Sequence, residues 1–258
     1  MKKYALIGER LEHSYSMIVH RDIYEEWGID ATFELLECSE DELPMMVKKL
    51  KTGEYSGYNV TFPYKKTIMK YIDIISDEAK HIGSVNTIYV VDGKTIGYNT
   101  DYFGFYYELL YYRVPVHGKD CYVLGTGGAA LAVRKALVDL GGNVYYVSRH
   151  PEGKNTISYQ ELENRKIDVL VNATPVGLYP DVDKSPVSKE IAKKAAYALD
   201  CIFNPSVTKM LEYNGSKMNG LFMLVYQAIK AEELFQNREY DGDIDALLRK
   251  IEAEIWIK

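Results

Sequence analysis

The sequence is poor in cysteine and has no surplus of positive charge. Its three cysteines, Cys38, Cys121 and Cys201, are far apart, odd in number and without the spacing of a metal site. We expect them to be small core residues in a reducing compartment, and we expect no bound metal. The net charge of −6 argues against nucleic acid or an anionic membrane surface as a partner.

Long apolar runs are also missing. The apolar stretch after Lys2 and Lys3 is too short for a signal-peptide core, and no segment approaches the ~18–20 apolar residues of a membrane-spanning helix. Hydrophobic residues make up 47% and charged residues 26% of the 258 positions, which is ordinary for a globular protein and argues against disorder. We therefore expect a soluble, cytoplasmic protein of one large domain or two smaller ones.

Signals for strands and helices alternate along the first third of the chain. Three short strands are predicted at residues 4–8, 32–37 and 58–62. Val19, Ile23 and Trp27 recur at four-residue spacing, which predicts one face of a helix between the first two strands. Residues 87–98 predict a hairpin that turns at Asp92-Gly93.

In the second half, predicted strands and helices alternate as they do in a parallel sheet. Its predicted strands are residues 121–124, 144–147, 169–171 and 198–202. Helical stretches separate them, and such strand–helix–strand units build parallel sheets. A tyrosine-rich helix within residues 101–118 is expected where the halves meet, and residues 221–258 predict helices with an acidic break at 241–243.

A glycine-rich turn follows the first strand of this half. Gly125, Gly127 and Ala130 form a G-x-G-x-x-A pattern between a predicted strand and a predicted helix. Gly125 permits the tight turn, Gly127 lets the backbone approach a pyrophosphate, and Ala130 lets the helix pack close to the sheet. Such turns also occur without a ligand, but the free N–H groups of the helix that follows favour a phosphate here.

The residues after the next predicted strand indicate which dinucleotide is bound. An NAD site commonly has a carboxylate ~20 residues after the glycine turn, whereas this chain has Ser148-Arg149 followed by Lys154. An arginine suits the 2′-phosphate of NADP and can stack on adenine. Glu152 lies nearby and leaves NAD open, and a solvated surface charge is the alternative for Arg149. We predict NADP as the cofactor.

Four segments of the first third carry many compact polar side chains. They are His13-Ser14-Tyr15-Ser16, residues 59–65, Ser84-Val85-Asn86-Thr87 and Asn99-Thr100-Asp101. Alternate residues of an extended chain point the same way, so Ser14 and Ser16 can face one side together. Asn59 and Thr61 have the same spacing. Taken singly, each segment has another interpretation: a serine that caps the next helix, a pair of turn residues, or a surface lysine.

Together, and in this order, the segments resemble the shikimate dehydrogenase family. The resemblance extends over nearly the whole chain, and such a series of motifs is far more specific than the glycine turn alone. The motifs are Gly8…His13-Ser14-x-Ser16…His20, Asn59-Val60-Thr61-x-Pro63-x-Lys65, Asn86-Thr87, Gly97-Tyr98-Asn99-Thr100-Asp101-x-x-Gly104, Gly125-x-Gly127-Gly128-Ala129, Asn172-Ala173-Thr174-Pro175-x-Gly177, Asp200…Pro205-x-x-Thr208 and Gly220…Met223-Leu224-x-x-Gln227-Ala228.

The resemblance implies an α/β fold of two domains with a deep cleft between them. An N-terminal α/β substrate-binding domain would occupy residues 1–101, and a Rossmann-type NADP-binding domain residues 102–219. Residues 220–258 would be C-terminal helices that return to the substrate domain. The expected assembly is a monomer or a homodimer.

The resemblance also implies an activity and a set of site residues. The chain is expected to reduce 3-dehydroshikimate reversibly to shikimate with NADPH, a step of chorismate and aromatic amino-acid biosynthesis. Ser14 and Ser16 would bind the substrate carboxylate. The hydroxyls would be bound by Asn59, Thr61, Lys65, Asn86, Asp101 and Gln227. The cofactor-binding residues would be Gly125, Thr126, Gly127, Gly128, Ala129, Ser148, Arg149, Lys154, Asn172, Thr174, Phe203 and Gly220.

Lys65 and Asp101 are the residues that the resemblance makes catalytic. Reduction of the keto group needs a hydride from NADPH and a proton for the nascent alkoxide. Lys65, paired with Asp101, would be the acid–base group that transfers this proton. Two alternatives stay open: Lys65 mainly orients the substrate oxygen and stabilises its developing charge, or the pair is only a structural ion pair.

Four residues depart from the family pattern. Met17 stands where proline is usual, and Arg21 stands where asparagine is usual, without a consequence that the sequence reveals. Phe203 replaces a tyrosine, which would remove one hydrogen bond to a ligand, about 0.5–1.5 kcal/mol. Ser148 replaces an asparagine before the arginine of the cofactor site.

Three other functions fit parts of the pattern. A quinate/shikimate dehydrogenase that uses NAD would need the same polar segments. A non-catalytic ligand sensor would keep both binding sites, although the intact Lys65 and Asp101 argue against it. A two-domain NADP enzyme that acts on a folate would not need the serine pair.

Overall fold

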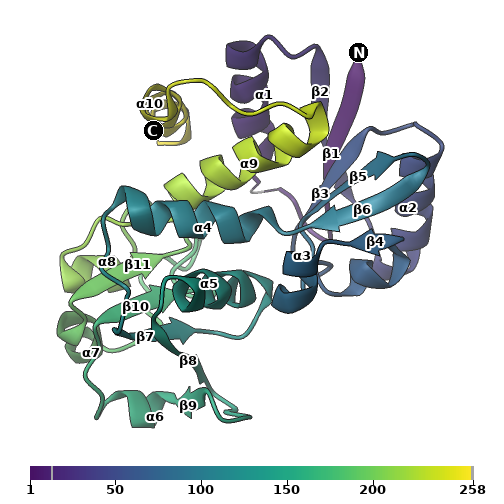
Figure 1. Cartoon of the computed structure of the whole chain (residues 1–258). Coiled ribbons are helices and arrows are strands. Elements are labelled where there is room, and N and C mark those ends of the chain that lie inside the picture. Colours follow the sequence, from purple (N-terminus) through teal and green to yellow (C-terminus); the bar gives the residue numbers. More distant parts are fainter. Residues whose placement is uncertain (13, 257–258) are drawn as a thin grey trace. The chain divides into compact units, whose positions relative to one another are not determined.

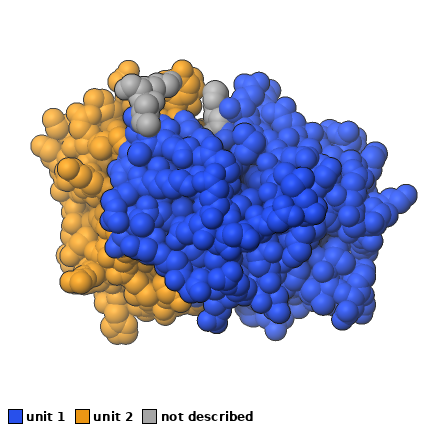
Figure 2. Space-filling model, turned by 90° about the horizontal axis from the view of Figure 1, so that it is seen from above, with its two compact units in different colours: residues 1–104, 224–258 blue, residues 105–223 orange. Residues whose placement is uncertain are grey.

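Each half of the chain builds its own sheet, and in the computed structural model the chain divides into two units (Figures 1 and 2). The structure describes residues 1–12 and 14–256. Unit 1 comprises residues 1–104 and 224–258, and unit 2 comprises residues 105–223. Both units combine helices and strands, so the α/β fold class predicted from the sequence is confirmed.

Unit 1 contains a six-stranded mixed sheet in the order β2-β1-β3-β5-β6-β4. Its strands are β1 (Lys2–Gly8), β2 (Ala31–Glu37), β3 (Gly57–Val60), β4 (Ile74–Ile75), β5 (Thr87–Val91) and β6 (Lys94–Tyr98). β1 pairs in parallel with β2 and β3, while β5 runs antiparallel to β3 and β6. The predicted hairpin is confirmed: Asp92 and Gly93 have positive φ angles of 49° and 75°, as a two-residue type I′ turn requires.

Helices pack on both faces of this sheet. They are α1 (Ser16–Trp27), the 3₁₀ segment η1 (Glu40–Glu42) that leads into α2 (Leu43–Lys51), η2 (Thr67–Tyr71), α3 (Asp77–Ile82), α10 (Ile244–Ile255) and the C-terminal part of α9 (Leu221–Gln236). α1 packs against β2, and α2 packs against β5 and β6. Because side chains alternate along β1, Tyr4 and Leu6 join one apolar cluster, while Ala5 and Ile7 join another.

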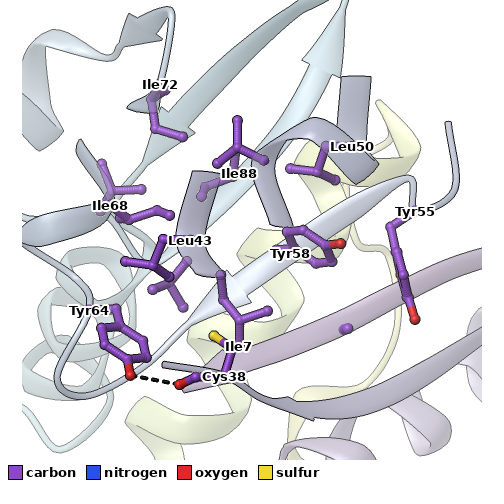
Figure 3. Close-up of a cluster of buried hydrophobic side chains, with 14 of the residues drawn as sticks. Ile7, Cys38, Leu43, Leu50, Tyr55, Tyr58, Tyr64, Ile68, Ile72 and Ile88 are labelled. Carbon is purple, nitrogen blue, oxygen red and sulfur yellow. Dashed lines mark hydrogen bonds between the residues drawn. The ribbon is translucent and has the colours of Figure 1, made fainter. Parts of the chain in front are cut away.

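The cluster around α2 fixes the chain next to a candidate site residue (Figure 3). Leu43 and Leu50 lie on one helical face and are buried against the sheet. The buried Tyr64 donates from its hydroxyl to the Cys38 carbonyl at 2.6 Å, drawn as a dashed line in Figure 3. This anchor holds the backbone immediately before Lys65.

Unit 2 contains a five-stranded parallel sheet in the order β11-β10-β7-β8-β9. Its strands are β7 (Asp120–Leu124), β8 (Asn143–Ser148), β9 (Thr156–Ser158), β10 (Val169–Asn172) and β11 (Tyr197–Asp200). Its helices include α5 (Gly128–Asp139), α6 (Tyr159–Leu162), α7 (Lys189–Lys194) and α8 (Lys209–Asn214). The chain runs from β7 outward to β9 and then resumes at β10 on the other side of β7, which is the Rossmann-type arrangement.

Two long helices connect the units. α4 (Thr100–Tyr111) and α9 each extend from one unit into the other. The predicted acidic break after α9 is confirmed, because Asp243 caps α10 by accepting from the N–H groups of Asp245 and Ala246.

Two strands end earlier than the sequence pattern predicts. β3 stops at Val60 because the chain turns there, with the Tyr64 N–H donating to the Thr61 carbonyl at 2.9 Å. β11 stops at Asp200 because the Ile202 N–H donates to the Asp200 carboxylate at 2.9 Å instead of to a neighbouring strand.

The described residues also bear on metals and membranes. Among them, no group of three or more His, Cys, Asp or Glu side chains is placed to hold a metal ion. In the same part of the chain, no helix combines the length and apolar character needed to cross a membrane. Cys38 and Cys121 are buried and Cys201 is partly buried, and none of these three described cysteines forms a disulfide bond.

Candidate active site

Polar side chains of unit 1 gather at one edge of its sheet. The parallel strands β1 and β3 both end at this edge. The antiparallel pairing brings the start of β5 and the end of β6 to the same edge, where Asn59 lies opposite Thr87 and Thr87 lies opposite Tyr98. The predicted substrate-binding segments of the first third leave from these strand ends.

Lys65 forms a largely buried ion pair with Asp101. Its Nζ lies 2.5 Å from Asp101 Oδ2, and the two side chains are 17% and 8% exposed. The second oxygen of Asp101 accepts a hydrogen bond from Asn86 Nδ2 at 3.0 Å. The carboxylate is therefore held on both sides, and the remaining N–H donors of Lys65 are available to a substrate oxygen.

Asn86 connects this pair to the rest of the sheet edge. Its Oδ1 accepts from the Thr100 N–H at 2.6 Å and from Thr87 Oγ1 at 3.1 Å. Asn59 Nδ2 donates to the Asn86 carbonyl and to Thr87 Oγ1. Asn59 Oδ1, however, is buried and has no hydrogen-bond partner among the described residues. An unpaired buried acceptor is costly, and a substrate hydroxyl would satisfy it.

Gln227 reaches the same cluster from the far end of the chain. It lies on α9, and its Oε1 is 3.4 Å from both Asn86 Nδ2 and Thr100 Oγ1. Its own Nε2 donates to the Leu224 carbonyl at 2.9 Å. The fold therefore brings Asn59, Lys65, Asn86, Asp101 and Gln227 into one hydrogen-bonded group.

The serine pair follows β1, outside this hydrogen-bonded group. Ser14 Oγ accepts from the Ser16 N–H at 3.3 Å, and the Ser14 N–H donates to the Leu11 carbonyl. The N-cap of α1 is Tyr15, and its own side chain makes no capping hydrogen bond. Ser14 therefore satisfies the first N–H of α1, although neither serine occupies the N-cap position. His13 of the same motif lies outside the described residues.

Thr61 lies beside the start of that serine segment. A Cβ at Gly8 would come within 2.7 Å of both Thr61 Cγ2 and Leu11 Cδ2. Gly8 thus permits the chain leaving β1 and the chain leaving β3 to approach closely. This proximity places Thr61 at the same sheet edge as the serine segment.

The glycine turn of unit 2 has the geometry that a dinucleotide needs. Gly125 has a φ of 101°, and a Cβ there would press on Thr174 Cγ2 and on the Ala173 carbonyl. At Gly127 a Cβ would meet nothing within 4 Å, so the backbone borders open space. α5 begins at Gly128 without a side-chain cap, which leaves its first N–H groups available for a phosphate.

This turn lies at the topological switch point of the sheet. β7 is flanked by β8 on one side and by β10 on the other, so the segments after β7 and β10 leave in different directions. Ligands of open α/β sheets bind at such a point, beyond the carboxyl ends of the strands. The glycine turn, with Thr126 and Ala129, and the segment Asn172 to Thr174 border it.

The predicted 2′-phosphate residues follow β8. Ser148 accepts the His150 N–H at 3.1 Å and so shapes the turn that exposes Arg149. Lys154 is exposed further along the same segment. Within the described part of the chain, neither cation forms an ion pair. Both are therefore free to meet a phosphate.

Asp200 organises the segments that follow β10 and β11, next to the candidate dinucleotide site, a role that the sequence patterns did not reveal. Its buried carboxylate accepts from Asn172 Nδ2 (3.0 Å), the Ile202 N–H (2.9 Å) and Thr208 Oγ1 (2.7 Å). Asn172 Oδ1 in turn accepts from Thr174 Oγ1 at 2.7 Å. One carboxylate thus ties together three segments, and non-local bonds of this kind leave no periodic signal.

Phe203 and Gly220 lie beside this carboxylate-centred network. Phe203 is partly buried in the segment that leaves β11. A Cβ at Gly220 would collide with the Cys201 carbonyl, so the glycine lets residues 201 and 220 pack backbone to backbone. The Gly220 N–H donates to the Ile202 carbonyl at 3.1 Å.

A second carboxyl group, Glu108 on α4, is buried in the same unit. It is 1% exposed, and its Oε1 has no hydrogen-bond partner among the described residues. Burial, reinforced by the negative charge of Asp200, raises the pKa of Glu108 well above its ordinary value. Burial also raises the pKa of Asp200, to about 7, although its hydrogen-bond donors act in the opposite direction. Glu108 is therefore the group expected to keep its proton at neutral pH.

This raised pKa predicts a pH effect on stability. As pH rises above the ordinary glutamate value, the unfolded chain releases the Glu108 proton while the folded chain retains it, so the free energy of unfolding falls. Glu108→Gln removes this contribution. For each pH unit above the ordinary glutamate pKa, the free energy of unfolding of the variant should rise by up to about 1.4 kcal/mol relative to that of wild type. Chemical denaturation at a series of pH values tests this, with the exposed Glu239→Gln as control; parallel curves for Glu108→Gln and wild type would contradict it.

One of the family departures now has a structural explanation. Arg21 on α1 forms ion pairs with Asp22 and with Glu254 of α10. The arginine therefore helps to attach the last helix, a role that asparagine is too short to fill. Met17 is half-exposed at the start of α1, and nothing in the structure explains its presence.

Known proteins resemble this chain in sequence over most of its length. A family model described as the shikimate dehydrogenase substrate binding domain matches residues 6–88. The shikimate dehydrogenase (NADP(+)) of Clostridium beijerinckii is 40% identical over 257 residues, covering 95% of each chain. The counterpart from Methanococcus maripaludis strain C6 is 36% identical and covers 93% of each.

Solved structures give the same result for the whole fold. Shikimate dehydrogenase 1 from Peptoclostridium difficile is 39% identical with a TM-score of 0.92, covering 99% of this chain and all of that one. The enzyme from Thermus thermophilus, solved with NADP(H) and shikimate, is 29% identical with a TM-score of 0.85, covering 98% and 99%. With relatives of this identity matched over almost its full length, the chain belongs to the shikimate dehydrogenase family.

Proposed function

We propose that this protein catalyses the reversible, NADPH-dependent reduction of 3-dehydroshikimate to shikimate. The observation that carries the proposal is the largely buried Lys65–Asp101 pair at a sheet edge, with Asn86 and Gln227 hydrogen-bonded beside it. Residues 1–101 form the substrate-binding part, and residues 102–219 form the dinucleotide-binding part. Residues 220–258 are the C-terminal helices, which bring Gln227 back to the substrate-binding part.

In this mechanism, the side chains of unit 1 place the substrate and supply its proton. NADPH supplies the hydride to the keto carbon when it is bound. Lys65 Nζ donates a proton to the keto oxygen, so that carbon and oxygen each gain one hydrogen and the alcohol forms. Asp101 holds the ammonium group in place, and Asn86 prevents the carboxylate from turning away. Shikimate oxidation uses the same groups in reverse.

The substrate is a polyol carboxylate, and the polar side chains divide accordingly. Ser14 and Ser16 bind the carboxylate. The hydroxyls are bound by Asn59, Thr61, Lys65, Asn86, Asp101 and Gln227. The buried, unpaired Oδ1 of Asn59 supports this assignment, because a hydroxyl donor would complete its hydrogen bonding.

The residues of unit 2 fit NADP. The turn Gly125-Thr126-Gly127-Gly128-Ala129 receives the pyrophosphate at the start of α5. Arg149 and Lys154 pair with the 2′-phosphate, next to Ser148. Asn172, Thr174, Phe203 and Gly220 serve the nicotinamide side, around the Asp200 carboxylate.

A steady-state assay with four combinations of substrate and coenzyme tests the function. Shikimate and quinate are each offered with NADP and with NAD, and the reduced coenzyme is followed by its absorbance. Turnover mainly with shikimate and NADP supports the proposal. Preference for NAD and activity on quinate would indicate a quinate/shikimate dehydrogenase instead. Binding of shikimate without turnover would indicate a non-catalytic sensor. A rise in Tm with folates but not with shikimate would indicate a folate enzyme and overturn the proposed function.

The remaining proposals concern the protein in the cell. We place it in the cytoplasm, in the route to chorismate and the aromatic amino acids, with small molecules rather than nucleic acid as its ligands. We expect a monomer or a homodimer, which light scattering coupled to size-exclusion chromatography measures directly.

A further inference from the structure

A fully buried carboxylate in unit 1 joins the helix that begins at the serine pair to the helix that carries Gln227. Glu232 of α9 and His20 of α1 are both 0% exposed, and Glu232 Oε1 lies 2.7 Å from His20 Nδ1. The same oxygen accepts a hydrogen bond from the Tyr24 hydroxyl at 2.9 Å. Two side chains of α1 thus converge on one oxygen of α9.

The second oxygen of Glu232 is also satisfied. It accepts from Gln236 Nε2 at 2.9 Å, and the same Nε2 lies 3.2 Å from the Tyr4 hydroxyl of β1. Burial raises the pKa of Tyr4 to about 12, so its hydroxyl keeps its proton. No lysine or arginine contacts Glu232 in the described part of the chain. A carboxylate buried in this way depends on its hydrogen-bond donors, which makes their geometry restrictive.

His20 is fixed in orientation as well as in position. Its ring stacks on Phe33 of β2, with 3.8 Å between ring centroids and an interplanar angle of 7°. Because Nδ1 faces a carboxylate oxygen, Nδ1 must carry a proton. A rotation of the ring would break both the stack and the hydrogen bond. A shift of α1 along α9 would therefore cost these two interactions.

Both helices carry residues proposed to touch the substrate. Ser16 is the first residue of α1 and His20 follows one turn later. Gln227 lies on α9, five residues before Glu232. The serines face the carboxylate of the proposed substrate, and Gln227 faces a hydroxyl. The His20–Glu232 contact therefore joins the helix that begins at the serine pair to the helix that carries Gln227, and both groups are proposed to bind one small molecule.

We propose that His20 and Glu232 are positioning residues that set the distance between the serine pair and Gln227 and so set the affinity for the substrate. This inference rests on the proposed function for the identity of the ligand. The residues do not touch the substrate; they act through α1 and α9. A shift of α1 relative to α9 should weaken binding of the substrate carboxylate by the serine pair. It should not alter proton transfer at Lys65 or the coenzyme site in unit 2.

The main test replaces Glu232 by leucine and compares it with the conservative Glu232→Gln. Glu232→Leu should raise the KM and the Kd for shikimate roughly 10-fold, the effect expected when about one hydrogen bond to the charged carboxylate is weakened. Its kcat and its KM for NADP should stay within about twofold of wild type. Glu232→Gln keeps an oxygen that can accept from His20 and Tyr24, and it should restore most of the affinity.

A second substrate separates positioning from general destabilisation. Shikimate methyl ester lacks the carboxylate charge, so the preference for shikimate over the ester should shrink in Glu232→Leu. The control is Thr95→Val, which removes a hydrogen bond of an equally buried side chain to Asp73 elsewhere in unit 1. It should lower Tm without changing the preference. If Glu232→Leu does not fold, His20→Phe replaces it, since phenylalanine keeps the stack on Phe33 and removes the donor.

The outcomes distinguish this inference from the function on which it rests. Titration calorimetry measures the Kd for shikimate without any need for turnover, and wild type is measured first. If wild type neither binds nor oxidises shikimate, the proposed function fails. If wild type binds it and Glu232→Leu binds it equally well, or loses affinity for shikimate, its ester and NADP in equal measure, the positioning role is overturned.

Discussion

Lys65→Ala is expected to lower kcat for shikimate oxidation by roughly 10³-fold, because a positioned acid–base group contributes on the order of 10²–10⁴. The KM for shikimate should change much less, since Asn59, Asn86 and Gln227 remain in place to bind its hydroxyls. Steady-state kinetics of NADPH formation measures both constants. Lys66→Ala is the matched control, because Lys66 is the exposed neighbour on the same segment.

A kcat near that of wild type would contradict the catalytic assignment and leave Lys65 and Asp101 as a structural ion pair. A further variant separates the two catalytic roles. Arginine keeps the positive charge and the N–H donors but does not release a proton in proteins. If Lys65 mainly stabilises developing charge, Lys65→Arg should recover much of the lost kcat. If Lys65 transfers the proton, arginine should be nearly as inactive as alanine.

The parts of the fold that the sequence predicted well are those with local causes. The hairpin at Asp92-Gly93 was predictable because a two-residue turn of this type demands positive φ at both positions. The buried face of α1 was predictable from the spacing of Val19, Ile23 and Trp27, all of which are buried. The glycine turn at Gly125 was predictable because strand, glycine and helix follow one another directly.

The parts that the sequence did not predict depend on contacts between distant residues. His20 and Glu232 are separated by 212 positions, and no periodicity marks either as a hydrogen-bond partner. Asp200 was noted only as a member of a motif, yet its carboxylate determines where β11 ends and holds Asn172. The unpaired oxygen of Asn59 likewise becomes visible only when all of its neighbours are placed.

The candidate sites of the two units follow one principle of construction. In each unit, a buried carboxylate hydrogen-bonds to segments that leave the sheet and adds to their apolar packing. Asp101 holds Lys65 and Asn86 in unit 1, and Asp200 holds Asn172 and Thr208 in unit 2. Hydrogen bonds to a charged group are directional and stronger than neutral ones. They can therefore fix the orientation of polar side chains at the ends of the strands.

Arg149→Ala is expected to shift coenzyme preference away from NADP. Arg149 is exposed after β8 and forms no ion pair in the described part of the chain, so it is free to bind the 2′-phosphate through its planar donors. Hydrogen bonds between charged groups contribute about 1.5–3 kcal/mol, so the KM for NADP should rise roughly 10- to 100-fold. The KM for NAD, which lacks this phosphate, should change little. Kinetics with both coenzymes at saturating shikimate provides the measurement.

Arg165→Ala is the control for the Arg149 prediction, because Arg165 is an exposed arginine of the same unit outside the predicted site. If Arg149→Ala raises the KM for NADP and the KM for NAD by the same factor, the arginine contacts the adenine rather than the 2′-phosphate. Combining Arg149→Ala with Lys154→Ala then shows whether both cations bind one group. If they do, the change in binding free energy for NADP in the double variant should differ from the sum of the two single changes. Independent surface charges would give changes that add.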